Sequence, residues 1–167
     1  PEMSRGLGDV YKRQVKNFGV SARTMLNKGD HPYMKEQAYQ QALAFNPNIV
    51  VIKLGTNDSK SFNWVYKADF IKDTQTMIDA FKALPSQPEI YLCYPSKAYL
   101  TGESINDDII SKEIIPMIKK VAKKNKLPVI DLHSAMDGMP ELFPDHIHPN
   151  EEGAKVMAKA VYDAIKK

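Results

Sequence analysis

Ile49-Val50-Val51-Ile52-Lys53-Leu54 is followed directly by Gly55-Thr56-Asn57-Asp58. The first six residues form a β-branched apolar run of strand length, and Gly55 marks its end. The polar residues after it form a loop in which the side-chain amide of Asn57 can donate a hydrogen bond to an oxyanion. The segment therefore predicts a strand that ends at a functional loop.

On either side of this segment, strand-like and helix-like stretches alternate. We expect strands at residues 15–20, 49–54, 89–93 and 127–131, and helices at 33–45, 67–84, about 106–125 and 151–166, with a kink at Pro116. This alternation predicts one α/β domain over residues 15–167, with a parallel sheet of about four strands and helices on both faces.

The loop Phe143-Pro144-Asp145-His146-Ile147-His148-Pro149-Asn150 precedes the last of these helices. Asp145 and His148 lie three residues apart between two prolines, so the carboxylate can bind the imidazole and direct the free ring nitrogen outward. Such a pair is the general-base part of a hydrolytic triad. Functional loops of a parallel sheet gather outside the carboxyl ends of its strands, so we expect this loop to lie near Asn57.

Composition narrows the class of protein. The 167 residues are 43% hydrophobic and 26% charged, and the net charge of +3 gives no indication of a nucleic-acid partner. We interpret a lysine cluster as a solvated helix face rather than a patch for an anionic partner; its members are Lys119, Lys120, Lys123, Lys124 and Lys126. Cys93 lies in a strand-like run and is expected to be a buried, inert thiol.

No window of the sequence approaches the roughly 18 apolar residues of a membrane span, so we expect no membrane partner. The N-terminus looks incomplete, which leaves the cellular location open and keeps a secreted or periplasmic site compatible with the sequence. We expect no cofactor and no metal.

In the order and type of its motifs, the chain resembles the SGNH, or GDSL-type, serine hydrolases. The resemblance covers about residues 15–167 and implies a flavodoxin-like, three-layer α/β/α esterase. Asn17-Phe18-Gly19-Val20-Ser21 resembles the second motif, which implies that the Gly19 amide donates to the oxyanion. Gly55-Thr56-Asn57-Asp58 resembles the third, with Asn57 as the side-chain donor. Asp145-His146-Ile147-His148 resembles the fifth, with His148 as the base and Asp145 as its orienting partner.

The first motif of that family, Gly-Asp-Ser, carries the nucleophile and is missing. Gly8-Asp9-Val10 is similar, but Val10 has no hydroxyl, and only Tyr11 to Gln14 separate it from the strand expected at Val15. A parallel crossover needs at least about 10 to 12 residues. We therefore expect residues 1–14 to be a non-native or unstructured leader, the first strand and helix of the family to be absent, and catalysis by this chain to be impaired.

Four further residues are candidates for the site. Ser21 and Ser59 follow expected strand ends and could replace the nucleophile, and Ser21 is the preferred one. Trp64 and Tyr94 lie in or near the same loops and could stack on a sugar, although ordinary packing is an equally good interpretation.

Three functions are compatible with these residues. The first is an ester hydrolase that acts on a small-molecule or carbohydrate ester, and the resemblance favours bacterial esterases that remove acetyl groups from carbohydrates. The second is a non-catalytic remnant that binds acyl or sugar ligands. The third is a metal-dependent hydrolase that uses His146 and His148, which no further Cys or His cluster supports.

The loss of a first strand would also affect assembly. It would leave unpaired backbone groups at the sheet and uncover the apolar surface beneath the missing helix. We therefore expect a homodimer built on the region from Val15 to Phe45.

Overall fold

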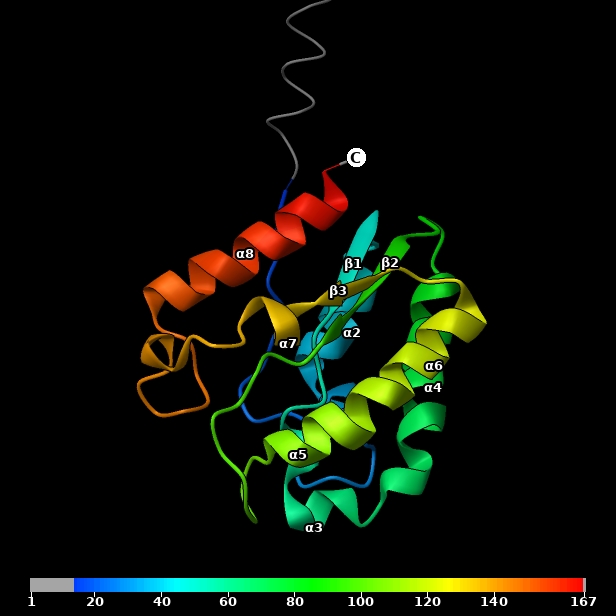
Figure 1. Ribbon diagram of the computed structural model, residues 1–167. Helices are drawn as coiled ribbons and strands as arrows, with labels where there is room; N and C mark the ends of the chain where they lie inside the picture. Colours follow the sequence, from blue (N-terminus) through cyan, green and yellow to red (C-terminus); the bar gives the residue numbers. More distant parts are fainter. Residues whose placement is uncertain (1–13, 167) are drawn as a thin grey trace, which may run out of the picture.

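Three parallel strands lie at the centre of the computed structural model, which describes residues 14–166 (Figure 1). They are β1 (Ile49–Ile52), β2 (Glu89–Tyr94) and β3 (Val129–Asp131), in the order β1-β2-β3. In the register, Leu92 of the central strand lies opposite Ile52 on one side and Val129 on the other. The prediction of an α/β protein with a parallel sheet is confirmed.

Helices connect and cover the strands. The longer helices are α2 (Gln37–Ala44), α4 (Phe70–Lys82), α6 (Ile115–Asn125) and α8 (Glu151–Ile165), and the short ones are α3 (Ser61–Trp64), α5 (Asp107–Ile109) and α7 (Leu132–Ala135). All four expected helical regions are present, but the first is divided at Glu36, where an extended backbone separates a 3-10 turn from α2. The single turns α3 and α7 are additions that the periodicity did not predict.

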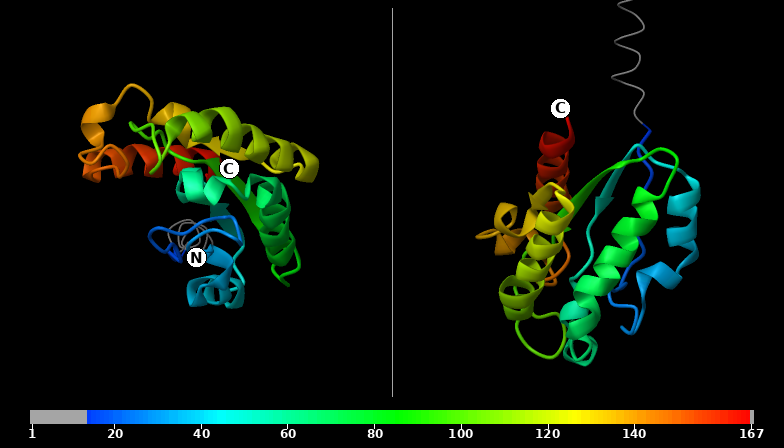
Figure 2. Two further views of the ribbon diagram at one scale, coloured as in Figure 1. Left: turned by 90° about the horizontal axis from the view of Figure 1, so that it is seen from below. Right: turned by 90° about the vertical axis from the view of Figure 1, so that its right-hand side faces the viewer.

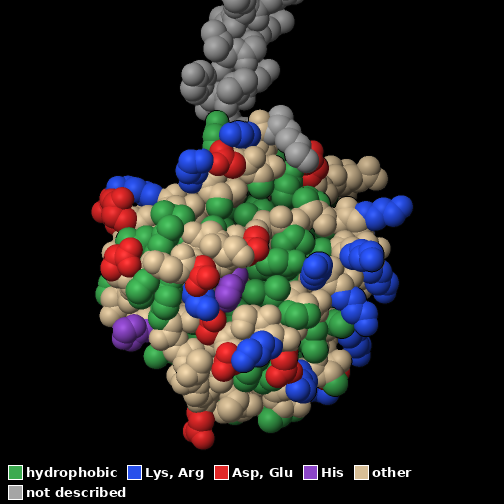
Figure 3. Space-filling view, viewed as in Figure 1, with side chains coloured by type: hydrophobic (Ala, Val, Ile, Leu, Met, Phe, Trp, Pro, Cys, Tyr) green, Lys and Arg blue, Asp and Glu red, His purple; other side chains and the backbone are tan. Residues whose placement is uncertain are grey.

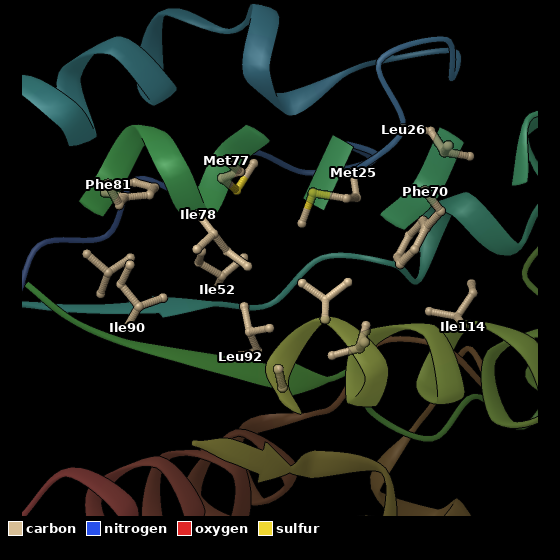
Figure 4. Packing of buried hydrophobic residues seen from close by; sticks show 14 of the residues in the cluster. Met25, Leu26, Ile52, Phe70, Met77, Ile78, Phe81, Ile90, Leu92 and Ile114 are labelled. Carbon is tan, nitrogen blue, oxygen red and sulfur yellow. The ribbon is translucent and has the colours of Figure 1, made fainter. Parts of the chain in front are cut away.

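The larger hydrophobic core lies between the sheet and helices α4 and α6 (Figure 4). Alternate residues of the strands point into it, including Ile52 of β1 and Leu92 of β2. Helix α4 presents Phe70 and Ile78, which are fully buried, because apolar side chains three and four residues apart share one helix face. This amphipathic spacing fixes how α4 lies against the sheet.

Helix α8 covers the opposite face of the sheet (Figures 1 and 2). A smaller core there contains Tyr91 and Cys93 of β2, and Met157 and Val161 of α8 pack against it. The strands therefore have helices on both faces, as predicted for a three-layer α/β/α arrangement. Burial raises the pKa of the Cys93 thiol to about 12, so Cys93 is the buried, inert thiol that its position in the sequence indicated.

A π-helical turn, Ile110–Ile114, joins α5 to α6 immediately before Pro116. Proline has no backbone N–H to donate and its ring crowds the preceding turn, so a regular helix cannot continue through this position without distortion. The wider π turn takes up that distortion, and Ile110 and Ile114 within it are fully buried. This turn is the structural counterpart of the kink expected at Pro116.

One expected strand is absent, and among residues 14–166 the sheet has three strands rather than about four. Residues 15–20 form an unpaired segment in which Val15 is 89% exposed. A strand requires a neighbour to complete its backbone hydrogen bonds, and no strand of residues 14–166 lies beside this segment. Phe18 holds it to the domain through its ring, which packs on Phe45, and through its carbonyl, which accepts from the Tyr33 hydroxyl at 2.8 Å. The leader expected at residues 1–14 falls almost entirely outside the described residues.

The surface agrees with the composition. Lys and Arg side chains gather over α6 on the right-hand side of Figure 3, and the five lysines of residues 119–126 are exposed. Within residues 14–166, every helix is too short or too polar to cross a membrane.

Candidate active site

A cavity of about 460 Å³ lies where the loops after β1 and β2 meet two other segments of the chain. Its lining includes residues 53–57 after β1, Ser96 after β2, residues 20–23, and residues 147–149 before α8. Because parallel strands end at a common edge, these distant segments converge. Ser21, Asn57 and His148 thereby share one cavity.

The Asp145 carboxylate holds His148 in two ways. Oδ2 of Asp145 lies 2.6 Å from Nδ1 of the imidazole, and Oδ1 accepts the backbone N–H of His148 at 2.6 Å and that of Ile147 at 3.0 Å. These contacts, the His148 backbone N–H above all, hold the pKa of Asp145 well below its usual range. Since Nδ1 faces the carboxylate, Nε2 is left as the nitrogen that can exchange a proton with a ligand.

Tyr99, in the loop after β2, fixes the position of the turn that carries this pair. Its backbone N–H donates to the carbonyl of His146 at 2.7 Å. Its hydroxyl donates to the carbonyl of Met136 at 2.6 Å and accepts from the N–H of Met139 at 2.8 Å, while its ring packs on Phe143 at 5.2 Å. The loop around His148 is therefore held at several points, although His148 itself is exposed.

Gly55 determines the path of the other loop. Its φ of +124° is a conformation that side chains rarely allow, and an added Cβ would lie 3.0 Å from Pro95 and 3.1 Å from Ile114. This close turn brings Asn57 to the cavity, where its side-chain amide donates one N–H to the carbonyl of Arg23 at 3.2 Å. The second N–H of that amide is available to a ligand.

Asp58 is a buried carboxylate that joins the loop after β1 to residues 25–26. Its Oδ2 accepts the backbone N–H of Met25 at 3.0 Å, and its Oδ1 accepts that of Leu26 at 2.8 Å. Burial raises its pKa to about 6, against the lowering effect of these two hydrogen bonds. Asp58 thus ties residues 25–26 to the loop after β1.

The motifs agree with a comparison to known families. Residues 1–156 match the model of the GDSL-like Lipase/Acylhydrolase family, which is most of the chain. An acetylxylan esterase from Xylanibacter ruminicola is 50% identical over 96% of the chain. The chain belongs to the GDSL-like family. It spans 37% of the length of that acetylxylan esterase.

Solved structures of similar shape show the same fold. The crystal structure of an acetyl xylan esterase, AlAXEase, has a TM-score of 0.71 at 20% identity, and the match covers 98% of this chain and 87% of that one. A lipase/acylhydrolase from Enterococcus faecalis has a TM-score of 0.66 at 28% identity, with 76% and 65% covered. The residues that line the cavity described above therefore belong to a domain with the GDSL-like fold.

Gly19 does not occupy the place expected of an oxyanion donor in this GDSL-like chain. It is exposed, lies outside the cavity lining, and donates its N–H to Oδ1 of Asn17 at 2.8 Å. Asn side chains often bind the backbone two residues further on and so form a local turn. In this arrangement the Gly19 N–H is engaged by its own segment, and Asn57 is the expected donor that reaches the cavity.

The two aromatic candidates do not line the cavity either. Trp64 is 6% exposed, donates its indole N–H to Glu113 at 2.9 Å and packs edge-on against Phe70, so it belongs to the core. Tyr94 is half-buried at the end of β2. Ordinary packing is the better interpretation of Trp64, because a short helix turns it inward.

Of the two serines, Ser21 alone remains a candidate nucleophile. It is exposed and lines the cavity with His148, although no hydrogen bond joins its hydroxyl to the imidazole in the described part of the chain. Ser59 is buried, where its hydroxyl donates to the carbonyl of Thr56 and accepts the N–H of Asn106. Residues 14–166 contain no group of three or more His, Cys, Asp or Glu side chains arranged to hold a metal ion.

A second Asp–His contact lies outside the cavity lining. Asp107 binds Nε2 of His133 at 3.0 Å and Nζ of Lys97 at 2.8 Å, and these partners lower its pKa to about 2 despite its burial. The sequence indicated only a helix start at Asn106-Asp107-Asp108. These contacts join the loop after β2 to the start of α5 and to α7.

Proposed function

We propose that this chain is the hydrolase domain of a carbohydrate esterase that removes acetyl groups from sugar hydroxyls. The observation that carries the proposal is the Asp145–His148 pair, whose imidazole lines a cavity shared with the Asn57 amide. A general base and a polarised N–H donor on one cavity are the parts that ester hydrolysis requires. The 50% identity to a protein named acetylxylan esterase supports acetyl as the acyl group.

In this mechanism His148 takes a proton through Nε2 from the attacking hydroxyl. Asp145 keeps the imidazole in the orientation and tautomer that expose Nε2, and it stabilises the positive charge that the ring acquires. The second N–H of Asn57 binds the negative charge that develops on the carbonyl oxygen. His148 then returns the proton to the departing sugar oxygen. When the attacking hydroxyl is that of a serine, the acetyl group stays on it until a water molecule, deprotonated by His148, attacks the acetyl group and releases acetate, and the proton returns to the serine oxygen.

The source of the nucleophile determines the rate. In residues 14–166 no serine hydroxyl is hydrogen-bonded to His148, and members of a triad act as a unit. We therefore expect slow hydrolysis, in which the Asp145–His148 pair activates a water molecule in place of the serine of a complete triad. Ser21 is the second possibility that the geometry offers, because it lines the same cavity.

Acetate release from acetylated xylo-oligosaccharides tests the function. The wild-type chain should release acetate slowly, and His148→Ala should abolish that release, while His31→Ala, at an exposed histidine outside the cavity lining, should keep it. Equal rates in the wild type and His148→Ala would refute the proposal. Inhibition by a chelator would instead favour the metal-dependent alternative.

Labelling with a fluorophosphonate, followed by measurement of the intact mass, distinguishes a catalytic domain from one that only binds its ligand. A single adduct that is lost in Ser21→Ala would identify Ser21 as the nucleophile. Absence of an adduct and of acetate release, together with binding of the oligosaccharide, would establish a domain that binds acyl sugars without turnover.

We also propose that two copies associate beside β1. This strand has one neighbour, β2, among the described strands, and Val51 on it is 38% exposed, as is Phe45 nearby in sequence at 37%. An unpaired strand edge with apolar residues is a common site of association. Light scattering should give a dimer for the wild type and a monomer for Val51→Lys, and a wild-type monomer at micromolar concentration would contradict the proposal.

A further inference from the structure

The cavity lining is cationic. Arg23, Lys53 and Lys60 contribute its positive charges, and no Asp or Glu side chain is among the described lining residues. Opposite charges elsewhere neutralise two of these cations. Arg23 is paired with Glu36 at 2.7 Å, and Lys60 with Asp30 at 3.2 Å.

Lys53 differs from the other two cations because no carboxylate of residues 14–166 forms an ion pair with it. It directly follows β1, and its neighbour on β2 is the buried thiol of Cys93. Burial raises the pKa of that thiol to about 12, so the thiol stays neutral and supplies no counter-charge. Lys53 therefore holds the one cation of the described lining that lacks a compensating carboxylate.

Lys53 is solvent-exposed and lines the cavity wall. Desolvation by neighbouring protein atoms lowers the pKa of Lys53, while its side chain keeps contact with solvent through the cavity. Water therefore reaches the ammonium group, and no carboxylate of the described residues competes with a ligand for it.

We propose that Lys53 forms a subsite for a carboxylate group in this cavity. The proposal deepens the function above and rests on the same cavity, in which His148 and Asn57 act on the ester. A carboxylate there has two sources: the acid that ester hydrolysis releases, or an acidic group carried by the sugar. Both present the same charge and the same two acceptor oxygens to the ammonium group.

Titration of the folded chain with acetate, glucuronate and glucose, followed by amide chemical shifts in NMR spectra, tests the subsite. Both carboxylates should shift resonances of residues 53–57, and glucose should not. Tighter binding of glucuronate than of acetate would identify an acidic sugar as the ligand, and equal or weaker binding would identify the acid product.

Variants distinguish binding that depends on Lys53 from binding that depends on the overall positive charge of the protein. Lys53→Gln should weaken carboxylate binding about tenfold or more, as expected for loss of one charged hydrogen bond, whereas Lys53→Arg should largely retain it. Lys119→Gln, which removes an exposed lysine on α6, should have no effect. Unchanged affinity in Lys53→Gln, or binding of glucose as tight as that of glucuronate, would overturn the proposal.

Carboxylate binding tests the Lys53 subsite, whereas acetate release tests the esterase function. Carboxylate binding that depends on Lys53, in a chain that releases no acetate, would leave the subsite standing and refute the esterase function. Acetate release that depends on His148, together with carboxylate binding that does not depend on Lys53, would support the esterase function and refute the subsite. A spectrum of Lys53→Gln that matches the wild type outside the cavity would show that the variant is folded.

Discussion

Asp145 holds His148 by both its ring and its backbone, with Oδ2 at 2.6 Å from Nδ1 and Oδ1 at 2.6 Å from the backbone nitrogen. The backbone contact is the larger cause of the low pKa of Asp145. The carboxylate is thus bound to the turn itself, and the imidazole is placed against a carboxylate whose position does not depend on the ring.

Removing the His148 ring tests how much of the low pKa of Asp145 comes from the backbone contacts. His148→Ala removes the imidazole but keeps both backbone N–H donors, so the pKa of Asp145 should rise only part of the way to its ordinary value. Carboxyl ¹³C NMR titration measures it. Asp163, paired with Lys159 and Lys166, should titrate unchanged in the same sample. A fully ordinary pKa for Asp145 would show that the ring is what holds the turn.

Asp58→Asn should destabilise the fold. The two Asp58 oxygens each accept a backbone N–H, whereas an amide can accept with only one side and would set its NH₂ against the other donor. The expected loss is about 1–3 kcal/mol in the free energy of unfolding, measured with urea. Asp108→Asn, at an exposed ion pair with Lys112, should cost well under about 1 kcal/mol.

Stability should also depend on pH through Asp58. Its folded pKa of about 6 lies above the ordinary value of 3.8, so the folded state binds the proton more tightly. The associated stability is present below pH 4 and is lost as pH rises through 6, up to about 3 kcal/mol. The difference in unfolding free energy between wild type and Asp58→Asn should therefore grow from pH 7 to pH 4. Asp107, with a pKa of about 2, acts only below this window.

Gly55→Ala should cost about 1–3 kcal/mol, because the φ of +124° is one that few side chains tolerate and the new Cβ would press on Pro95 and Ile114. Thermal unfolding measures the loss. Gly102→Ala provides a matched control: its φ is +148°, but nothing lies within 4 Å of the added Cβ. If both variants lose the same stability, backbone strain alone explains the effect. A larger loss in Gly55→Ala would show that the contacts of the new Cβ with Pro95 and Ile114 add to the cost.

Tyr99→Phe removes the hydroxyl that joins the carbonyl of Met136 to the N–H of Met139 but keeps the ring on Phe143. The expected loss is about 1 kcal/mol, since a partly buried donor and acceptor lose their partner. Hydrogen exchange at Met139 should accelerate, while exchange in β2 should follow only the global change. Unaltered exchange at Met139 would show that water replaces the hydroxyl.

Local patterns predicted most of these features. The β-branched run before Gly55, the amphipathic spacing in α4, and the three-residue spacing of Asp145 and His148 each concern neighbours in the chain, so the sequence reveals them directly. The cavity could be expected too, because parallel strands end at one edge.

Features that depend on distant partners were missed. Residues 15–20 have the composition of a strand, but a strand forms only where a neighbouring strand completes its hydrogen bonds. Trp64 was placed near the site because its loop follows β1, yet a short helix turns it toward Phe70 and Glu113. The contact between Asp107 and His133 joins residues 26 apart, which no periodicity reveals.

The sequence has a single cysteine, and the fold places it at the centre of the sheet with 1% exposure. The accessibility of the Cys93 thiol therefore reports transient opening of the core. An alkylating reagent can reach it only when α8 or a flanking strand moves away from β2, so the labelling rate under native conditions measures how often that happens. No engineered probe is needed: the chain records its own core opening in one covalent event per molecule, which mass spectrometry counts.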